Sequence, residues 1–375
     1  MKAEFPDLSE RTVPMTHEIQ SLLDILTSIH LLSPGKEMDK LRQLGDRHDE
    51  FVSFALGSLS DRNEVVRRNA ALVLGEMGDP KEIVVSALIA ALGDKDEQVR
   101  RASATALGKF GNAAEAAIPV LITKLTHYSQ RAEPEAGWAL AEIGIAAVPA
   151  LIAALPHENP AFAMSISLTL GAIGAPAVPS LVAALDHPLE NVRWEAARAL
   201  NEIGAAAWDA VGRLAMALDD GCRHVRQHAA EALGKIGIAA AVAVPRLVAR
   251  LADEDVQVRQ NAVKALGQIG SPLKAVIPAL NTALEDADEN VIRDAARSLG
   301  KIGPPAYPVL FSAFATGKHV VRGYVAETLG EIGVPAEPAI PALVEALADP
   351  AANIRYLSAI ALGRIGPQAA AAVPR

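Results

Sequence analysis

Residues 225–237 read Val-Arg-Gln-His-Ala-Ala-Glu-Ala-Leu-Gly-Lys-Ile-Gly, and their closing phrase, Leu-Gly-x-Ile-Gly, recurs in close variants along the chain. Ten copies follow one another at intervals of 33 or 30 residues. A fixed period of this length is typical of one supersecondary unit stacked on copies of itself, in which each unit buries its apolar face only against its neighbours. The closing leucines are Leu74, Leu107, Leu140, Leu170, Leu200, Leu233, Leu266, Leu299, Leu329 and Leu362.

Each unit has the pattern of two helices. Twenty-one residues before the closing leucine is a position usually filled by proline, which suits the first turn of a helix because its missing N–H costs nothing there. The residues that follow predict an amphipathic helix, a short polar loop and a second helix with apolar residues at i, i+4 and i+8. The glycines near the end of the second helix favour termination and close approach of the next unit. The proline position holds Pro119, Pro149, Pro179, Pro245, Pro278, Pro308 and Pro341, with Ser53, Ser86 and Gly212 in the other units.

All variation in unit length lies in the link from the last glycine of one unit to the proline position of the next. Six links have eight steps, and three are shorter by three residues. Three residues make roughly one helical turn, so we expect the stack to change its bend at units four, five and nine. The short links run from Gly144 to Pro149, from Gly174 to Pro179 and from Gly303 to Pro308.

Composition supports a helical protein and argues against several function classes. Hydrophobic residues make up 51% of the chain and aromatic residues only 4%, so the core is built mainly from Ala, Leu, Val and Ile, of which Ala and Leu are strong helix formers. The net charge of −9 and the pI near 5.5 argue against a general nucleic-acid binder, which needs a basic face. The single cysteine, Cys222, allows no internal disulfide. We find neither a signal peptide nor an apolar stretch near the roughly 18–20 residues of a membrane span, and therefore expect a soluble, cytoplasmic protein with no membrane partner.

The repeats divide the chain into three parts. Residues 1–47 do not match the repeat and predict an N-terminal helical cap, because terminal units of repeat arrays need a different outer face. Residues 48–366 form the array of ten units, and residues 367–375 look like the start of a further, truncated repeat with Pro374 in the proline position. Such an end leaves the apolar face of the tenth unit open, so we expect either a truncated chain or another molecule that covers it.

Segments such as Ala-Val-Pro-Ala-Leu-Ile-Ala-Ala-Leu at 147–155, together with Asp-x-x-Val-Arg-x-x-Ala-x-x-Ala-Leu-Gly-x-Ile-Gly, resemble the HEAT-like repeats of the phycobilisome-lyase (E–Z) type. The resemblance covers roughly residues 48–375 and implies an all-α fold, a right-handed α-solenoid of about ten helical hairpins. It says little about function, because such repeats occur in bilin lyase subunits, in deoxyhypusine hydroxylase and in scaffolds. The hydroxylase would need repeated His-Glu pairs as iron ligands, whereas this chain has only His17-Glu18 and His157-Glu158.

Aspartate and arginine recur at fixed positions of the unit, thirteen and seven residues before the closing leucine. We expect a ladder of carboxylate–guanidinium contacts, within or between units, that satisfies the loops and sets the register of neighbouring repeats. The alternative is an anion-binding row. The aspartates are Asp61, Asp94, Asp220, Asp253, Asp286 and Asp349, and the arginines are Arg67, Arg100, Arg193, Arg226, Arg259, Arg322 and Arg355.

Histidine replaces this aspartate in units three to five, at His127, His157 and His187. Stacked helices lie roughly 8–10 Å apart, so three imidazoles in a row cannot share one zinc ion at bond lengths of ~2.0–2.1 Å, although two adjacent ones could. The simpler interpretation is a polar loop residue in place of aspartate. The alternative is a metal-binding or pH-sensitive site, and we predict no metal ligand here.

The inner surface of such a repeat array is usually lined by the second helices. Residues six and two before the closing leucine, and two after it, form one stripe on each second helix. In units three to five this stripe predicts an exposed, partner-binding patch, because Trp and Arg are enriched in binding hot spots. Burial of the same side chains by tight curvature is the alternative. The patch consists of Trp138, Met164, Leu168, Trp194 and Arg198.

A basic run lies beside this patch. It could receive acidic groups of a partner, or it could be an ordinary solvated face. It consists of Lys235, Lys264, Arg293, Arg297 and Lys301.

Catalytic motifs are absent: we find no P-loop, dinucleotide fingerprint or nucleophile elbow. Cys222 and His224 are close in sequence, but this alone does not make Cys222 reactive. We expect Trp208 to pack between units. The prediction is a non-enzymatic scaffold or adaptor that binds a protein or peptide and needs no cofactor, with its oligomeric state open. The alternative is a protein resembling bilin lyase subunits that handles a tetrapyrrole, lined by Trp138, Met164, Leu168 and Trp194, with His127 or His157 as a polar contact.

Overall fold

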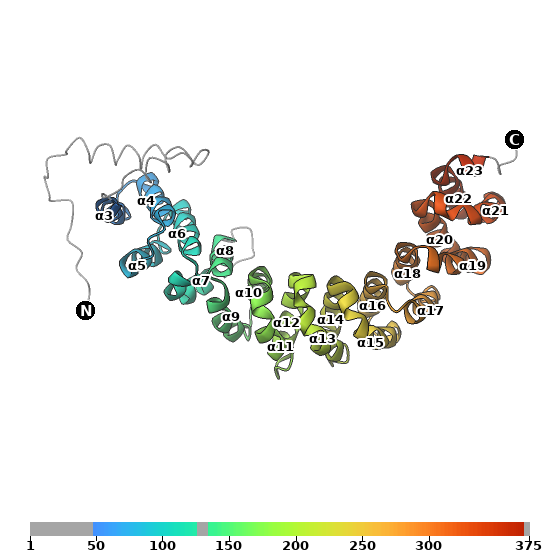
Figure 1. Ribbon diagram of the computed structural model, residues 1–375, viewed down its shortest axis with the longest axis horizontal. Coiled ribbons are helices and arrows are strands. Elements are labelled where there is room, and N and C mark those ends of the chain that lie inside the picture. The colour runs from blue at the N-terminus through green and yellow to red at the C-terminus, as the bar shows by residue number, and fades with distance from the viewer. Residues whose placement is uncertain (1–47, 126–133, 371–375) are drawn as a thin grey trace. The chain divides into compact units, whose positions relative to one another are not determined.

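The computed structural model describes residues 48–125 and 134–370. Within these residues every regular element is a helix, and the helices form ten consecutive pairs (Figure 1). The all-α solenoid predicted from the repeats is therefore confirmed, while its right-handed sense stays a prediction. The expected cap at residues 1–47 lies outside the described residues.

The chain divides into two compact units, residues 1–177 and 178–375. In each unit the second helices of successive pairs pack against one another and the first helices lie on the other side (Figure 1). The pairs of the first unit are α3 (His48–Ser58) and α4 (Glu64–Met77), α5 (Glu82–Ala91) and α6 (Glu97–Lys109), α7 (Ile118–Lys124) and α8 (Pro134–Ile143), and α9 (Val148–Ala154) and α10 (Pro160–Ile173). Those of the second are α11 (Val178–Ala184) and α12 (Glu190–Ile203), α13 (Val211–Ala217) and α14 (Arg223–Ile236), α15 (Val244–Ala249) and α16 (Val256–Ile269), α17 (Leu273–Ala283) and α18 (Glu289–Ile302), α19 (Tyr307–Thr316) and α20 (His319–Ile332), and α21 (Ile340–Glu345) and α22 (Ala352–Ile365), followed by α23 (Pro367–Ala370).

The closing phrase works through its leucine and its two glycines. All ten closing leucines are at most 5% exposed, and burying each contributes about 1.5–3 kcal/mol. The last glycine of every copy has a φ between 55° and 88°, a left-handed conformation that ends the helix and favours glycine. The first glycine admits the next second helix: a Cβ at Gly75 would lie 2.7 Å from the Cα of Ala106. Both predicted roles of the glycines are confirmed.

Most links are short 3₁₀ helices, and their lengths follow the two repeat periods. Four of the six long links hold η3 (Gly111–Ala117), η6 (Gly204–Ala210), η7 (Gly237–Ala243) and η10 (Val334–Ala339), of six or seven residues, while the links before α5 and α17 hold no 3₁₀ helix. The short links hold η4 (Gly144–Ala147), η5 (Ala175–Ala177) and η9 (Pro304–Ala306), of three or four residues. The short links thus lack one turn, as predicted. The change of bend stays a prediction.

Three first helices depart from the predicted pattern: α3 and α5 begin five and four residues before Ser53 and Ser86, and α17 begins before Pro278. Most proline positions fall in the first turn, as Pro149 does in α9. Pro278 instead lies inside α17, which begins five residues earlier at Leu273, because Pro272 in extended conformation already serves as its N-cap. The link before α17 is therefore absorbed into the helix.

Two continuous helical runs are long and apolar enough to cross a membrane by length and composition alone, which corrects our expectation that no stretch was. They are Glu135–Ala154 and Arg223–Ala252, and a third pair, Pro160–Ile173 with Ala175–Ala184, is bent by 116°. Each continuous run joins two helices of the repeat through a 3₁₀ helix whose first glycine has a positive φ. Leu140 and Leu151 of the first run and Leu233 and Leu247 of the second are fully buried in the repeat core, and 39% and 44% of the two apolar windows are buried inside the protein.

Candidate binding surface on the second helices

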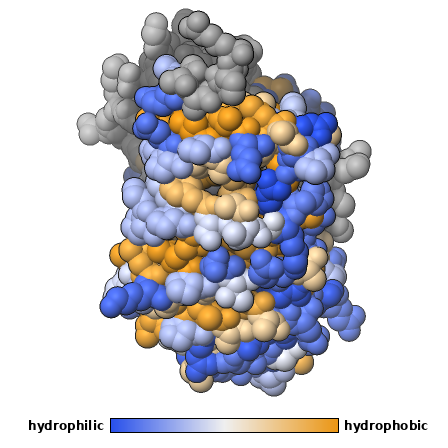
Figure 2. Space-filling model, turned by 90° about the vertical axis from the view of Figure 1, so that its right-hand side faces the viewer, coloured by the Kyte–Doolittle hydropathy of each residue, from blue (hydrophilic) through white to orange (hydrophobic). Residues whose placement is uncertain are grey.

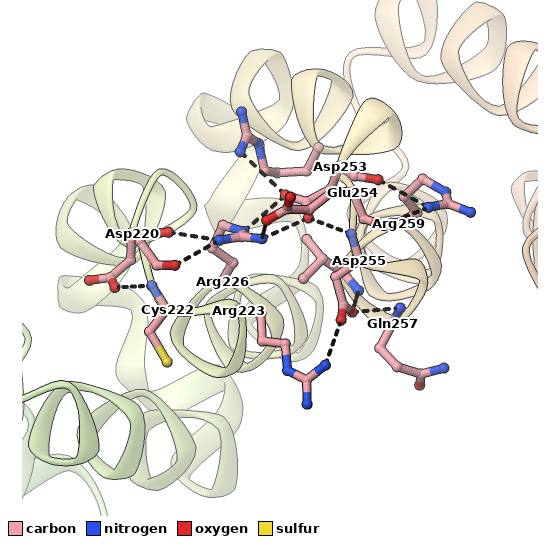
Figure 3. Close-up of polar contacts among 12 residues, drawn as sticks. Asp220, Cys222, Arg223, Arg226, Asp253, Glu254, Asp255, Gln257 and Arg259 are labelled. Atoms are coloured by element: carbon pink, nitrogen blue, oxygen red, sulfur yellow. Dashed lines mark hydrogen bonds and ion pairs between the residues drawn. The ribbon is translucent and has the colours of Figure 1, made fainter.

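The Arg–Asp ladder runs between neighbouring repeats. In four of the five rungs within the described residues, the arginine of one second helix makes two parallel hydrogen bonds to the aspartate in the loop of the next repeat, a geometry that strengthens such pairs. Arg322 instead contacts Asp349 through Nη1 alone. Figure 3 shows one stretch, in which Arg226 Nε and Nη2 lie 2.9 Å from the two carboxylate oxygens of Asp253. The other rungs in the described residues are Arg67–Asp94, Arg193–Asp220, Arg259–Asp286 and Arg322–Asp349, at closest distances of 2.8, 2.7, 2.9 and 2.5 Å.

The same side chains also hydrogen-bond backbone groups of the loops. Arg226 Nη1 donates to the carbonyl oxygens of Asp220 and Gly221, at 3.0 and 3.2 Å. Asp253 Oδ1 accepts the backbone N–H of Asp255 at 3.0 Å, which closes a turn before the next helix. Both members of a rung are thus satisfied within the protein. The ladder sets register and does not form an anion-binding row.

In the Arg67–Asp94 and Arg226–Asp253 rungs, the pKa values of the two partners shift in opposite directions. The hydrogen bonds from Arg67 hold the pKa of the Asp94 carboxyl below its ordinary value, although burial opposes them. Burial acts to raise the pKa of Asp253, but the hydrogen bonds from Arg226 and from the backbone of Asp255 outweigh it, so that pKa is lowered as well. Conversely, the hydrogen bond to Asp94 raises the pKa of the Arg67 guanidinium.

We expect Asp94→Asn to lower the free energy of unfolding by about 1.5–3 kcal/mol at neutral pH, the typical loss of hydrogen bonds to a charged group. A carboxylate whose folded pKa is depressed stabilises the protein above its unfolded pKa of about 3.9, and this contribution disappears as pH falls through the folded value. The difference between wild type and variant in urea denaturation should therefore shrink below about pH 4. Asp209→Asn, at an exposed position of η6, is the control and should match wild type throughout. A constant difference for Asp94→Asn down to acid pH would contradict the ladder's role.

The histidines at the aspartate position keep the loop contact of the residue that they replace. His157 Nδ1 accepts the backbone N–H of Asn159 at 3.0 Å, and His187 Nδ1 accepts that of Leu189 at 3.2 Å. The ring of His157 also packs edge-on against Phe162, with centroids 4.5 Å apart. This favours the polar loop interpretation for both. No group of three potential metal ligands occurs within residues 48–125 and 134–370, and His127 lies outside them.

We call the side formed by the second helices in each unit the second-helix face. In the first unit, Trp138 on α8 is 42% exposed. Its ring lies over Gly108 of α6, where an added Cβ would be 2.8 Å from Cζ3. Met164 and Leu168, on the neighbouring helix α10, are half-buried. An indole is thus presented to solvent on this face, resting on a glycine of the preceding repeat.

In the second unit, Trp194 on α12 is the centre of an aromatic and cationic cluster. Its ring stacks on His224 of α14, with centroids 4.6 Å apart, and runs nearly parallel to that of His228 at 6.4 Å. The guanidinium carbon of Arg198 lies 5.2 Å from the centre of the indole, within cation–π range. The Trp194 Nε1 and Arg198 Nη1 atoms are buried and have no hydrogen-bond partner within the described residues, which is rare for buried donors.

The predicted patch residues therefore fall into two groups. Trp138, Met164 and Leu168 belong to the first unit, and Trp194 and Arg198 to the second. Whether both groups serve one partner stays a prediction.

A row of buried polar side chains on the second helices was missed by the sequence analysis. It stands five residues before the closing leucine, where Glu195, Asn261 and Asp294 are at most 8% exposed. The amide of Asn261 donates to Glu231 at 2.9 Å, and that of Gln260 donates to Asp294 at 2.7 Å. The available signal was a polar residue at this position in most repeats; the second, ninth and tenth repeats hold Ala102, Tyr324 and Leu357 there.

The basic run lies on α14, α16 and α18 and is partly paired. Lys264 and Arg293 approach Asp294 at 3.3 and 3.6 Å. Arg297 lies 3.1 Å from Glu327 and 4.0 Å from Glu331 of α20. Lys235 and Lys301 are exposed.

Our expectation that Trp208 packs between units is wrong, because its side chain is 60% exposed. The reason is the 3₁₀ period of three residues, which turns Gly204, Ala207 and Ala210 of η6 toward the core and leaves Trp208 outward. Cys222 is a half-buried free thiol, and the nearby His224 stacks on Trp194.

On the side that Figure 2 presents, apolar and hydrophilic surface alternate in bands.

Comparison with known proteins agrees with this architecture. The family model described as HEAT repeats matches residues 52–129, 118–201, 178–254, 244–322 and 307–373. No curated protein matches the sequence. Among solved structures, Kap121p bound to Pho4p is similar with a TM-score of 0.57 and 14% identity, over 93% of this chain and 45% of that one. The Kap95:Nup1 complex has a TM-score of 0.52 and 13% identity, over 94% of this chain and 56% of that one. An engineered protein has a TM-score of 0.42 and 24% identity, over 84% of this chain and 98% of that one.

This chain thus spans about half the length of the karyopherins that it resembles, and the likeness to them concerns the fold. The family match extends from the first described pair to the last. The protein belongs to the HEAT-repeat family.

Proposed function

We propose that the protein is a non-enzymatic scaffold or adaptor that binds a protein or peptide on its second-helix face. The observation that carries the proposal is the exposure of Trp138 on that face, 42% of its surface. A large exposed aromatic side chain is costly to keep in water and is among the residues most enriched at binding hot spots.

The second unit supports the same proposal. Trp194 is held in one orientation by His224 and Arg198, and a preorganised aromatic side chain loses little conformational entropy on binding. Two of the similar structures, Kap121p bound to Pho4p and the Kap95:Nup1 complex, each contain a protein partner. They are compatible with a protein partner for this chain.

Affinity capture from native extract tests the proposal with three tryptophan variants. We expect Trp138→Ala or Trp194→Ala to weaken retention of a specific partner by at least about tenfold, since truncating a hot-spot residue costs about 2 kcal/mol or more. Trp208→Ala is the matched control, because Trp208 is exposed but lies on a link outside the second-helix face. Circular dichroism establishes that each variant is folded. If wild type and the three variants captured the partner equally, Trp138 and Trp194 would have only a structural role.

The finer resemblance to the phycobilisome-lyase type stays a prediction, as does a cytoplasmic location. The function that this resemblance implies is binding of a tetrapyrrole. It is tested by titrating the protein with free bilin and following the absorbance of the bilin. Binding that is lost in Trp138→Ala or Trp194→Ala would replace the scaffold proposal.

A further inference from the structure

We propose that the second-helix face of the second unit binds an acidic peptide segment of the partner. The inference rests on the proposed function and specifies the chemistry of its partner. The binding surface, which we call the basic strip, consists of Lys235 on α14, Lys264 on α16, and Arg293, Arg297 and Lys301 on α18. These three second helices pack side by side in one compact unit.

The cations of the strip reach solvent. The side chains of Lys264 and Arg297 are 48% and 40% exposed and that of Arg293 is 32% exposed, while Lys235 and Lys301 are exposed residues. The chain as a whole carries a net charge of −9. The five cations on three adjacent helices therefore concentrate positive charge in one place on a chain whose net charge is negative.

Two carboxylates on these helices, Asp294 and Glu231, already hold donors of the protein. The Asp294 side chain is 10% exposed and accepts the Gln260 amide at 2.7 Å, while Lys264 and Arg293 converge on it. A single carboxylate thus holds two cations close together, which leaves an excess of positive charge at that point.

Glu231 also holds donors of the protein, although its side chain is 33% exposed. It accepts hydrogen bonds from the amides of Asn201 and Asn261 at 3.3 and 2.9 Å and contacts His228 Nδ1 at 3.0 Å. Burial acts to raise the pKa of Glu231, but the contacts with His228, Asn261 and Lys235 together outweigh it, so that pKa is lowered. Asp294 and Glu231 are thus both engaged by donors of the protein itself.

A peptide fits the borders of the strip better than a nucleic acid does. On the far side of α18, Glu327 and Glu331 of α20 approach Arg297, so a continuous phosphate backbone that crossed α18 would meet like charge. General nucleic-acid binding needs a broad basic field, whereas charge complementarity over a short strip is enough to orient an acidic peptide. The exposed Gln268, whose Oε1 lies over Gly234 of α14, adds an amide that can hydrogen-bond a peptide backbone between Lys235 and Lys264.

The test is fluorescence anisotropy with a labelled peptide of alternating Glu and Ser, using the full chain. We expect Lys235→Glu/Lys301→Glu to bind it at least about tenfold more weakly than wild type, as for charge reversal in a complementary interface. The matched control is Lys274→Glu/Lys318→Glu, which makes the same change in net charge at exposed residues on α17 and before α20. Binding should also weaken as salt is raised, because the contacts are solvent-exposed ion pairs.

Several results would overturn the inference: equal binding by both double variants, equal binding of a Lys–Ser peptide, or tighter binding of single-stranded oligo(dT) than of the acidic peptide at the same salt. The last result would assign the strip to nucleic acid. Failure here is distinguishable from failure of the proposed function. If Lys235→Glu/Lys301→Glu still captures a partner whose retention depends on Trp138 or Trp194, the scaffold proposal stands and only the acidic specificity is wrong.

Discussion

Arg226→Ala should lower the free energy of unfolding by about 3–5 kcal/mol, the typical cost of removing one partner of a buried ion pair. The Arg226 and Asp253 side chains are 7% and 2% exposed, so the variant leaves a buried aspartate that has lost its two-bond partner and retains only Arg250, at 3.3 Å, as a counter-charge. It also frees the carbonyl oxygens of Asp220 and Gly221, which Arg226 Nη1 otherwise satisfies. Because repeat arrays depend on nearest-neighbour interfaces, the loss falls on the contact between repeats six and seven. Urea denaturation followed by far-UV circular dichroism measures it.

Arg355→Ala is the matched control, because Arg355 stands at the same position of its repeat. It is exposed and donates to the carbonyl oxygens of Asp349 and Pro350, with no carboxylate contact among the described residues. We expect a loss of at most about 1 kcal/mol, as for exposed polar contacts. The double variant Arg226→Ala/Asp253→Ala should lose less than the sum of the two single variants, since no lone buried charge remains. Strict additivity would mean that the rung carries no coupling.

The ladder was predictable because its two members stand at fixed distances from the closing leucine, the aspartate in six and the arginine in seven of the ten repeats. What the sequence left open was the direction of the contact, within one unit or between two. Stacking decides it: the arginine of one repeat reaches the aspartate 27 residues later, as in Arg226–Asp253. The glycines were predictable for the same reason, since every phrase has the terminating glycine and all but two, which hold Ala141 and Asn201, also have the contact glycine.

The polar row on the second helices could not be predicted in the same way. A polar residue such as Asp294 in an Ala-rich helix can point to solvent or to a neighbouring helix, and the choice depends on partners such as Gln260, which is 34 residues away. The same limit applies to Trp194, whose ring is fixed by two histidines of the next repeat. Trp208 was misplaced because the link forms a 3₁₀ helix with a period of three, which turns Ala207 and Ala210 inward and Trp208 outward.

Gly75→Ala is expected to lower the free energy of unfolding by about 1–3 kcal/mol, the range for overpacking a close contact. Gly75 is buried on α4, and a Cβ there would lie 2.7 Å from both the Cα and the Cβ of Ala106 on α6. One of the opposing atoms is backbone, so the strain cannot be relieved by rotating a side chain. The two second helices have to separate, and that loosens the interface between repeats one and two.

Gly363→Ala separates this packing effect from helix propensity. Gly363 is the equivalent glycine of the tenth unit and lies within α22, but a Cβ there would meet nothing within 4 Å. Alanine is favoured over glycine in a helix interior by about 0.5–1 kcal/mol, so this variant should be slightly more stable than wild type. The same substitution at the same position of the repeat therefore has opposite expected signs in urea denaturation. If both variants lost stability equally, the glycine would serve the helix itself and not the approach of the next repeat.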